Sequence, residues 1–426
     1  MGTGSDIHSV NEKQLRNTLR KLGAVRTVIE QILIDDFPYL HGREALEAID
    51  ELFESRQLAI EATDPAADRA VVNRLCQAAQ ETISLYLPLV GFVLRSTNIR
   101  NAFELYGPLL GVAQAALGKD AHLVVSSEWE FSPYTLIPPS IGGTAFVLIG
   151  LPASESENAL VTPLAGHELG HSVWAVEAIE SKYGALIETE VENAIRGPRW
   201  AEFIKEFPQV GTRGKISDLI GRQIWEPAWT WCIQQLEELF CDAIGILVFA
   251  ESYLHAFSYL LAPSIQLERS VHYPSIKDRV EFMQRVFDDL GFPRIKDYGL
   301  CFDNDQVIGT SAKKVLLSVS DTARLALESK VWEEAKKIHS TWNFPAHSNS
   351  EIDEICKSFE VITPATRATS VANVVNAGWR TYLNGFKPWK EYEVTKNNPK
   401  KCESILNDLI LKSAEVLEIQ QRTSTT

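Results

Sequence analysis

The stretch His167-Glu168-Leu169-Gly170-His171 brings together the side chains that a hydrolytic metal site needs. Residues four apart in a helix lie on one face, so His167 and His171 can both bind a single zinc ion. Glu168 lies beside the first histidine but off the metal axis, where it can take a proton from a water that the metal activates. The spacing therefore predicts a zinc site on a helix.

The helix that carries this motif has a recognisable start. Thr162 is a suitable N-cap, and Pro163 fits the first helical position, where its missing N–H costs nothing. Nothing interrupts the helical pattern from Leu164 to about Glu180. We therefore expect the helix to begin just before the motif.

A catalytic zinc ion needs a third protein ligand. One known arrangement places a histidine six residues after the second histidine and a glycine between them. Glu177 and Trp174 occupy these two positions, so this arrangement is excluded. The other known arrangement takes a glutamate from a second helix.

A later helical run, opened by Pro227 and extending to Gly245, carries such a glutamate. Glu238 and Asp242 lie one turn apart on one face of this run. Glu238 can bind the zinc, and Asp242 can accept the N–H of a ligating histidine. Because the run is otherwise apolar, unpaired carboxylates there would be costly, and a metal with an imidazole would satisfy them.

Plainer interpretations of the same residues stay open. The two histidines can simply cap and pack, and Glu237 and Glu238 can form a solvated acidic face. Cys241 is a soft donor that could close a structural zinc site, although a buried packing role is commoner for a cysteine. His255, about thirteen residues beyond Asp242 on the same expected helix, is roughly 20 Å away and so too far to bind the ion.

HELGH followed by Glu-x-x-x-Asp resembles the gluzincin clan of zinc metallopeptidases, over roughly residues 140–285. The resemblance implies a role for each of the residues above. His167, His171 and Glu238 would bind the zinc, and Glu168 would be the catalytic base. Asp242 would accept a hydrogen bond from one of the ligating histidines. Glu237 falls where some gluzincins keep an asparagine that orients the other histidine.

A later segment, Val271-His-Tyr-Pro-Ser-Ile-Lys-Asp-Arg-Val280, is similar to the His-Pro…Arg segment of heat-shock-type and CAAX-processing membrane metallopeptidases. It departs from them by Tyr273, which is inserted between the histidine and the proline. The resemblance implies that His272, or Tyr273 in its place, stabilises the oxyanion of the tetrahedral intermediate. The alternative is a surface histidine before a helix that Pro274 starts.

Composition narrows the class of protein. A chain of 426 residues with 45% hydrophobic and 23% charged residues is typical of a soluble globular protein. A net charge of −15 argues against binding to nucleic acid or to an anionic membrane. Six cysteines without a C-x-x-C pair indicate reduced thiols, and no signal peptide or membrane span is expected. We therefore expect a cytoplasmic location.

The hydrophobic pattern predicts a predominantly helical α+β protein. Three regions are expected: an N-terminal helical region (1–120), a zincin-like core with a small sheet (121–295) and a C-terminal helical region (296–426). Strands are expected at 122–131 and 142–151.

The second expected strand has a candidate role in substrate binding. It contains Phe146, Val147 and Leu148, and it precedes the metal helix where zincins keep an edge strand. A peptide substrate could then add to this edge as a further strand. The alternative is a buried core strand, because a short apolar run cannot be placed from periodicity alone.

Together these features predict a zinc-dependent metallopeptidase that acts on a peptide or protein substrate. Two other classes of function stay open. One is a non-peptidase zinc hydrolase with the same core. The other is a binding or regulatory protein with a structural or degenerate metal site, for example one closed by Cys241.

Overall fold

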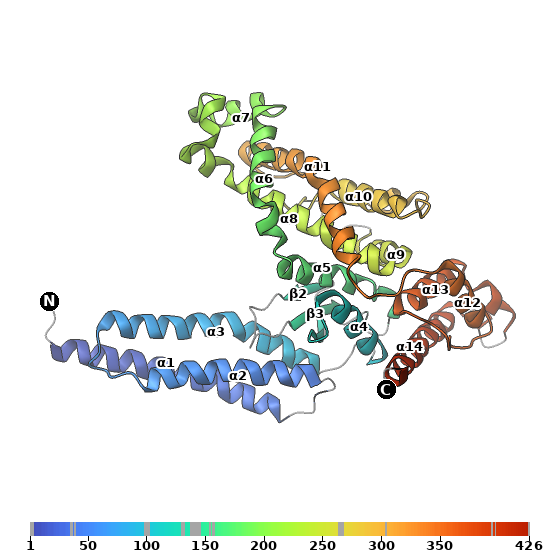
Figure 1. Ribbon diagram of the computed structural model, residues 1–426, viewed down its shortest axis with the longest axis horizontal. Helices are drawn as coiled ribbons and strands as arrows, with labels where there is room; N and C mark the ends of the chain where they lie inside the picture. The colour runs from blue at the N-terminus through green and yellow to red at the C-terminus, as the bar shows by residue number, and fades with distance from the viewer. Residues whose placement is uncertain are drawn as a thin grey trace. The chain divides into compact units, whose positions relative to one another are not determined.

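The computed structural model describes residues 4–34, 37, 40–97, 103–128, 133–136, 146–152, 155, 158–262, 268–302, 305–392, 395–396 and 398–424 (Figure 1). Helices predominate in these ranges, and a small mixed sheet of three strands accompanies them. This agrees with the helical α+β class predicted from the sequence. Within the described ranges, every helix is too short or too polar to cross a lipid bilayer. All six cysteines are free thiols.

The chain forms two compact units. Unit 1 contains residues 1–103 and 118–156, and unit 2 contains residues 104–117 and 157–426. The sheet thus groups with the N-terminal helices, whereas the HExxH helix groups with the C-terminal helices. This grouping differs from the three consecutive regions expected from the sequence.

Unit 1 packs three long helices against one another and a sheet against two of them. The helices are α1 (Gly4–Leu33), α2 (Leu40–Glu61) and α3 (Arg69–Thr97). Apolar residues at helical spacing point inward and form the core of this unit. Its buried residues include Leu22, Ile29, Leu46, Ile49, Phe53, Val72 and Phe92.

The sheet has the strand order β1-β3-β2. Its strands are β1 (His122–Glu128), β2 (Tyr134–Leu136) and β3 (Phe146–Pro152). β1 runs parallel to β3, with Val124 opposite Leu148, and β2 runs antiparallel on the other side. The ends of the two expected strands at 129–131 and 142–145 lie outside the described residues.

β3 is therefore the central strand, and the expectation of a free, peptide-binding edge there is wrong. Phe146, Val147 and Leu148 pair with β1, and all seven residues of β3 are buried. A strand that is apolar on both faces is suited to the middle of a sheet. The alternative of a buried core strand is the arrangement that the structure has.

Unit 2 is helical, and its longest helix, α8, packs against several of the others. In chain order its α-helices are α4 (Tyr106–Leu117), α5 (Leu164–Val176), α6 (Ile179–Arg196), α7 (Trp200–Glu206), α8 (Leu219–Phe249), α9 (Glu251–Leu261), α10 (Ile276–Asp289), α11 (Ser311–His339), α12 (Asn349–Glu360), α13 (Val371–Leu383) and α14 (Pro399–Ser424). Helix α8 contacts α5, α6, α10, α11 and α13.

The HExxH helix α5 begins at Leu164, as predicted, but it ends earlier than expected, at Val176. Ala178 adopts a left-handed conformation (φ 49°) and separates α5 from α6. The expected capping role of Thr162 is wrong, because its hydroxyl donates to the carbonyl of Ala159 at 2.7 Å. A short 3₁₀ turn (Ala159–Val161) precedes the helix, and the backbone N–H of Thr162 donates to the same Ala159 carbonyl at 3.3 Å.

Helix α8 begins earlier than the sequence suggested, and it ends before His255, which was expected on the same helix. It begins at Leu219, where Asp218 accepts from the Gly221 N–H at 2.8 Å, so Pro227 lies inside the helix and does not open it. It ends at Phe249. His255 therefore lies on a separate helix, α9, where its ring packs on Trp379 with centroids 5.4 Å apart.

Candidate metal centre

Helices α5 and α8 approach closely because small residues face one another where they meet. A Cβ atom on Gly170 would lie 2.7 Å from the Cα of Cys241, and one on Gly166 would lie 3.1 Å from the Cα of Gly245. Only glycine allows backbones to come this near. The close approach places the histidines of α5 beside the carboxylates of α8.

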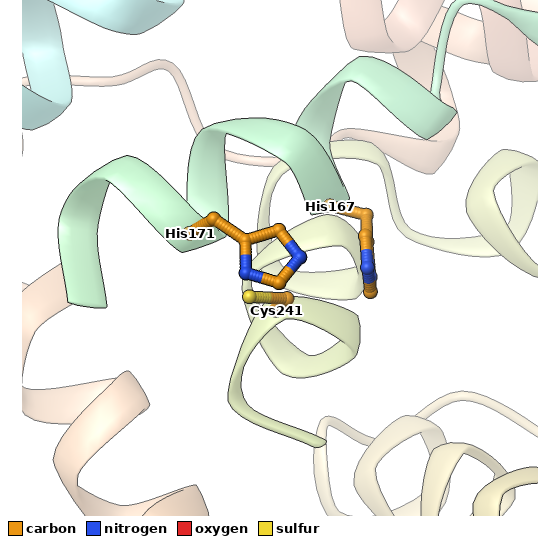
Figure 2. A group of neighbouring side chains, drawn as sticks. All are labelled: His167, His171 and Cys241. Carbon is orange, nitrogen blue, oxygen red and sulfur yellow. The ribbon is translucent and has the colours of Figure 1, made fainter. Parts of the chain in front are cut away.

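Each histidine of the motif is held by a different carboxylate of α8. His167 Nδ1 lies 3.0 Å from Asp242 Oδ1, and His171 Nδ1 lies 2.8 Å from Glu237 Oε1. The two rings are nearly perpendicular, with centroids 5.1 Å apart (Figure 2). An imidazole that donates Nδ1–H to a carboxylate keeps the lone pair of Nε2 for a metal.

Glu238 lies between the Nε2 atoms of the two histidines. Its Oε2 is 3.4 Å from His167 Nε2, and its Oε1 is 3.7 Å from His171 Nε2. Oε2 is buried, and no hydrogen bond of full geometry reaches it within the described residues, where its charged neighbours are His167 Nε2 and, at 3.2 Å, Arg279 Nη2. Ligand atoms that bind one tetrahedral zinc ion at about 2.0–2.1 Å are themselves about 3.4 Å apart. The separations of Glu238 from the two imidazoles fit a metal ion held by these three residues.

Asp242 is fully buried and stabilised by three donors. Arg279 donates from Nε to Oδ2 at 2.6 Å and from Nη2 to Oδ1 at 2.8 Å, and the Tyr253 hydroxyl donates to Oδ1 at 2.6 Å. Burial alone would raise the pKa of Asp242, but Arg279 and the hydrogen bonds outweigh it and hold that pKa well below its usual range. Asp242 is therefore a carboxylate that can hold His167.

The site as a whole favours positive charge. Burial lowers the pKa of the His167 imidazole, but hydrogen bonds to Asp242 and Glu238 outweigh burial and raise it to about 10. Burial would raise the pKa of Glu238, yet His167 and Arg279 lower it. A divalent cation suits a pocket whose carboxylates stay ionised.

Glu168 is buried on α5, within range of the charges of both histidines and Glu238. Burial raises the pKa of its carboxyl group, and the nearby imidazoles oppose this increase only in part. A raised carboxyl pKa improves a proton acceptor that must later return its proton.

Cys241 also lies at the centre of this cluster. Its Sγ and one nitrogen from each of His167 and His171 are within 4.8 Å of one another (Figure 2). Burial and the charge of Glu238 raise the pKa of the Cys241 thiol well above its usual range. Because the sulfur and the backbone of Cys241 pack directly against Gly170, we assign Cys241 to the contact between the two helices.

The segment before α10 brings His272 and Tyr273 to the same side of α8. His272 is exposed, and its Nδ1 lies 2.6 Å from Gln234 Oε1, one helical turn before Glu238. The Tyr273 ring packs over the Arg279 guanidinium at 5.5 Å. The charge of Glu238, followed by burial, raises the pKa of the Tyr273 hydroxyl.

Two residues of the site, Arg279 and Tyr253, were not predicted from the sequence. Arg279 is the arginine of the segment that resembles the His-Pro…Arg segment, and that resemblance could have indicated that it belongs to the site. Tyr253 gave no signal, because its contact with Asp242 depends on how α9 turns back against α8. The ring of Tyr253 fills the space that Gly245 leaves free, where a Cβ would lie 2.5 Å from Cε2.

A second cluster of possible metal ligands lies in unit 1 and comprises His41, Glu44 and His122. The rings of His41 and His122 are stacked, with an interplanar angle of 7° and centroids 4.2 Å apart. Parallel stacked rings cannot both direct in-plane lone pairs at one ion, and His41 Nδ1 already accepts from the Leu123 N–H at 3.2 Å. We therefore assign this cluster to the packing of α2 on β1.

Comparison with known proteins does not identify the site, which is therefore interpreted from its geometry alone. No family model, no curated protein and no solved structure matches this chain.

Proposed function

We propose that this chain is a zinc-dependent metallopeptidase of gluzincin type. The observation that carries the proposal is the position of Glu238, 3.4 Å from His167 Nε2 and 3.7 Å from His171 Nε2. Carboxylates also hold the opposite ring nitrogen of each histidine. Two imidazoles and one carboxylate form the ligand set of catalytic zinc sites, in which the fourth position is left for water or substrate.

Each residue then has a defined task. A bound zinc ion would polarise the scissile carbonyl and lower the pKa of the attacking water toward neutrality. Glu168 takes the proton of that water and passes it to the nitrogen of the leaving group. Asp242 and Glu237 keep the two imidazoles in the tautomer that leaves Nε2 unprotonated. Arg279 keeps Asp242 ionised.

Tyr273 and His272 are the candidates to stabilise the oxyanion. The Tyr273 hydroxyl is a neutral donor within the field of Glu238, and the residue is 44% exposed, so a substrate can reach it. Gln234 Oε1 accepts from His272 Nδ1, so a neutral His272 carries its proton on Nδ1 and only the imidazolium form can also donate from Nε2. Donors placed toward the developing negative charge contribute to catalysis through hydrogen bonds of this kind.

A second candidate is a zinc hydrolase that acts on another amide or an ester. Because β3 pairs on both sides, the sequence argument for a peptide-binding edge on that strand is lost, and the site residues by themselves suit another amide or an ester equally well. The metal centre and the role of Glu168 would be the same in both cases.

The zinc content of the purified protein tests the metal centre. We expect about one equivalent in the wild type and a sharp loss in His171→Ala and Glu238→Ala. Glu226→Ala is the matched control, because Glu226 is an exposed glutamate on the same helix, and it should retain the metal. Wild type that stays free of zinc after reconstitution, or Glu238→Ala that keeps it, would overturn the proposal.

The substrate class requires a separate assay. A pool of fluorogenic peptides should be cleaved by wild-type protein and not by Glu168→Gln. Cleavage of amide and ester probes without cleavage of any peptide would favour the second candidate.

A further inference from the structure

The join between α8 and α9 is a strained turn next to the metal centre. Ala250 has φ 51° and ψ −129° and is 3% exposed. This region of backbone space suits glycine, because a Cβ atom makes it costly for other residues. Strained residues of this kind persist only where surrounding contacts hold them.

Asn376, from helix α13, supplies those contacts. Its Oδ1 accepts from the Ser252 N–H at 2.9 Å, and its Nδ2 donates to the carbonyl of Phe249 at 2.8 Å. One amide side chain therefore holds the residues on both sides of Ala250. Nδ2 also donates to the Ala372 carbonyl at 2.8 Å, which fixes the amide to its own helix.

The turn decides where Tyr253 points. Tyr253 is in the first turn of α9, is fully buried, and donates to Asp242 Oδ1 at 2.6 Å. Its oxygen is also 3.3 Å from His167 Nδ1. A change in the direction of α9 would therefore move the hydroxyl that orients both the carboxylate and the imidazole.

We infer that Asn376 is a positioning residue for the metal centre, acting through the Ala250 turn and Tyr253 on Asp242 and His167. The inference rests on the proposed function, because it assigns an effect on a bound metal. It gives α13, in the C-terminal part of the chain, a role in metal binding. Residues that orient a metal ligand typically change metal affinity about 10–100-fold when lost, and a more distant residue should change it less.

Asn373 is a matched control on the same helix. It is an asparagine one turn earlier, it is equally buried, and its Oδ1 accepts from the Ser348 N–H at 3.3 Å, away from the turn. Asn373→Ala should lower the melting temperature as Asn376→Ala does. Only Asn376→Ala should change the metal centre.

The experiment measures Co²⁺ and Zn²⁺ binding to the full-length chain, with the Co²⁺ absorption spectrum as a readout of ligand geometry. We expect Asn376→Ala to weaken Zn²⁺ binding about three- to tenfold and to alter the spectrum, and Tyr253→Phe to weaken it about tenfold or more. Asn373→Ala should match wild type in both measurements. Ala250→Gly should restore binding to Asn376→Ala, because glycine adopts the turn without support.

The outcomes separate the two proposals. Wild type that binds no metal would overturn the proposed function and this inference with it. Wild type that binds zinc, with Asn376→Ala equal to it or Asn373→Ala equally weakened, would overturn this inference alone. If Asn376→Ala does not fold, the Ala250→Gly/Asn376→Ala double variant and Tyr253→Phe are measured in its place. Wild-type zinc affinity in Tyr253→Phe would overturn the inference. Weakened binding in Tyr253→Phe, together with wild-type affinity in Asn373→Ala and in the double variant, would support it.

Discussion

Replacing Arg279 with methionine tests the electrostatics of the metal centre. The guanidinium donates to Asp242 at 2.6 and 2.8 Å, and its Nη2 lies 3.2 Å from Glu238 Oε2. Asp242 is 0% exposed and Glu238 is 8% exposed. The variant therefore leaves two buried carboxylates without this counter-charge, and loss of one partner from a buried ion pair costs about 3–5 kcal/mol. We expect the free energy of unfolding to fall by that amount in the metal-free protein.

Zinc should recover part of this loss, because a dication supplies positive charge at the same carboxylates. If removal of the guanidinium tightens zinc binding about tenfold, saturating zinc reduces the deficit by about 1.4 kcal/mol. Urea unfolding of wild type and Arg279→Met, each with a chelator and with excess zinc, measures the four free energies that are needed.

Arg269→Met is the control for loss of a buried arginine. Arg269 is 5% exposed and donates to Asp321 at 2.7 and 2.5 Å and to the Tyr273 carbonyl at 3.4 Å, but not to any of the three proposed metal ligands. It should destabilise the protein comparably, with a deficit that zinc does not change. Two results would refute the reasoning. One is a loss of unfolding free energy below about 1 kcal/mol for Arg279→Met in chelator, which is the value typical of a surface ion pair. The other is a loss that excess zinc does not reduce.

Three further substitutions test other parts of the site. Glu168→Gln should keep a full equivalent of zinc while kcat falls about 10²–10⁴-fold, and turnover at the wild-type rate would show that another group is the base. Gly170→Ala should lower stability by about 1–3 kcal/mol and weaken zinc binding, measured by thermal melting and zinc titration, because its Cβ would lie 2.7 Å from the Cys241 Cα. Cys241→Ala should retain zinc, and loss of the metal in that variant would identify the thiolate as a ligand.

The imidazole pair could be predicted from the sequence because its geometry is local. Any helix places residues four apart on one face, so His167 and His171 needed only a helix around them. The same holds for Glu238 and Asp242 within α8. The helix bounds were less predictable: Pro227 sits inside α8 and not at its start, because Asp218 caps the helix further upstream.

Contacts between elements could not be predicted in the same way. β3 has the apolar composition of either a core strand or an edge strand, and only its pairing on both sides decides between them. Tyr253 reaches Asp242 only because Ala250 adopts a conformation that the sequence does not favour for alanine. A residue whose role depends on a strained turn carries no local signal.

The four-residue spacing in α5 serves both the HExxH motif and the contact with α8, because the glycines and the histidines each recur at that spacing. Gly166 and Gly170 each precede a histidine, so the stripe of α5 that touches α8 lies directly beside the stripe that carries the imidazoles. On α8, Cys241 likewise precedes Asp242. The distance between the helices and the distance between the proposed ligands are therefore fixed by the same residues. A larger side chain on the contact stripe should disturb the proposed metal centre although every ligand is kept.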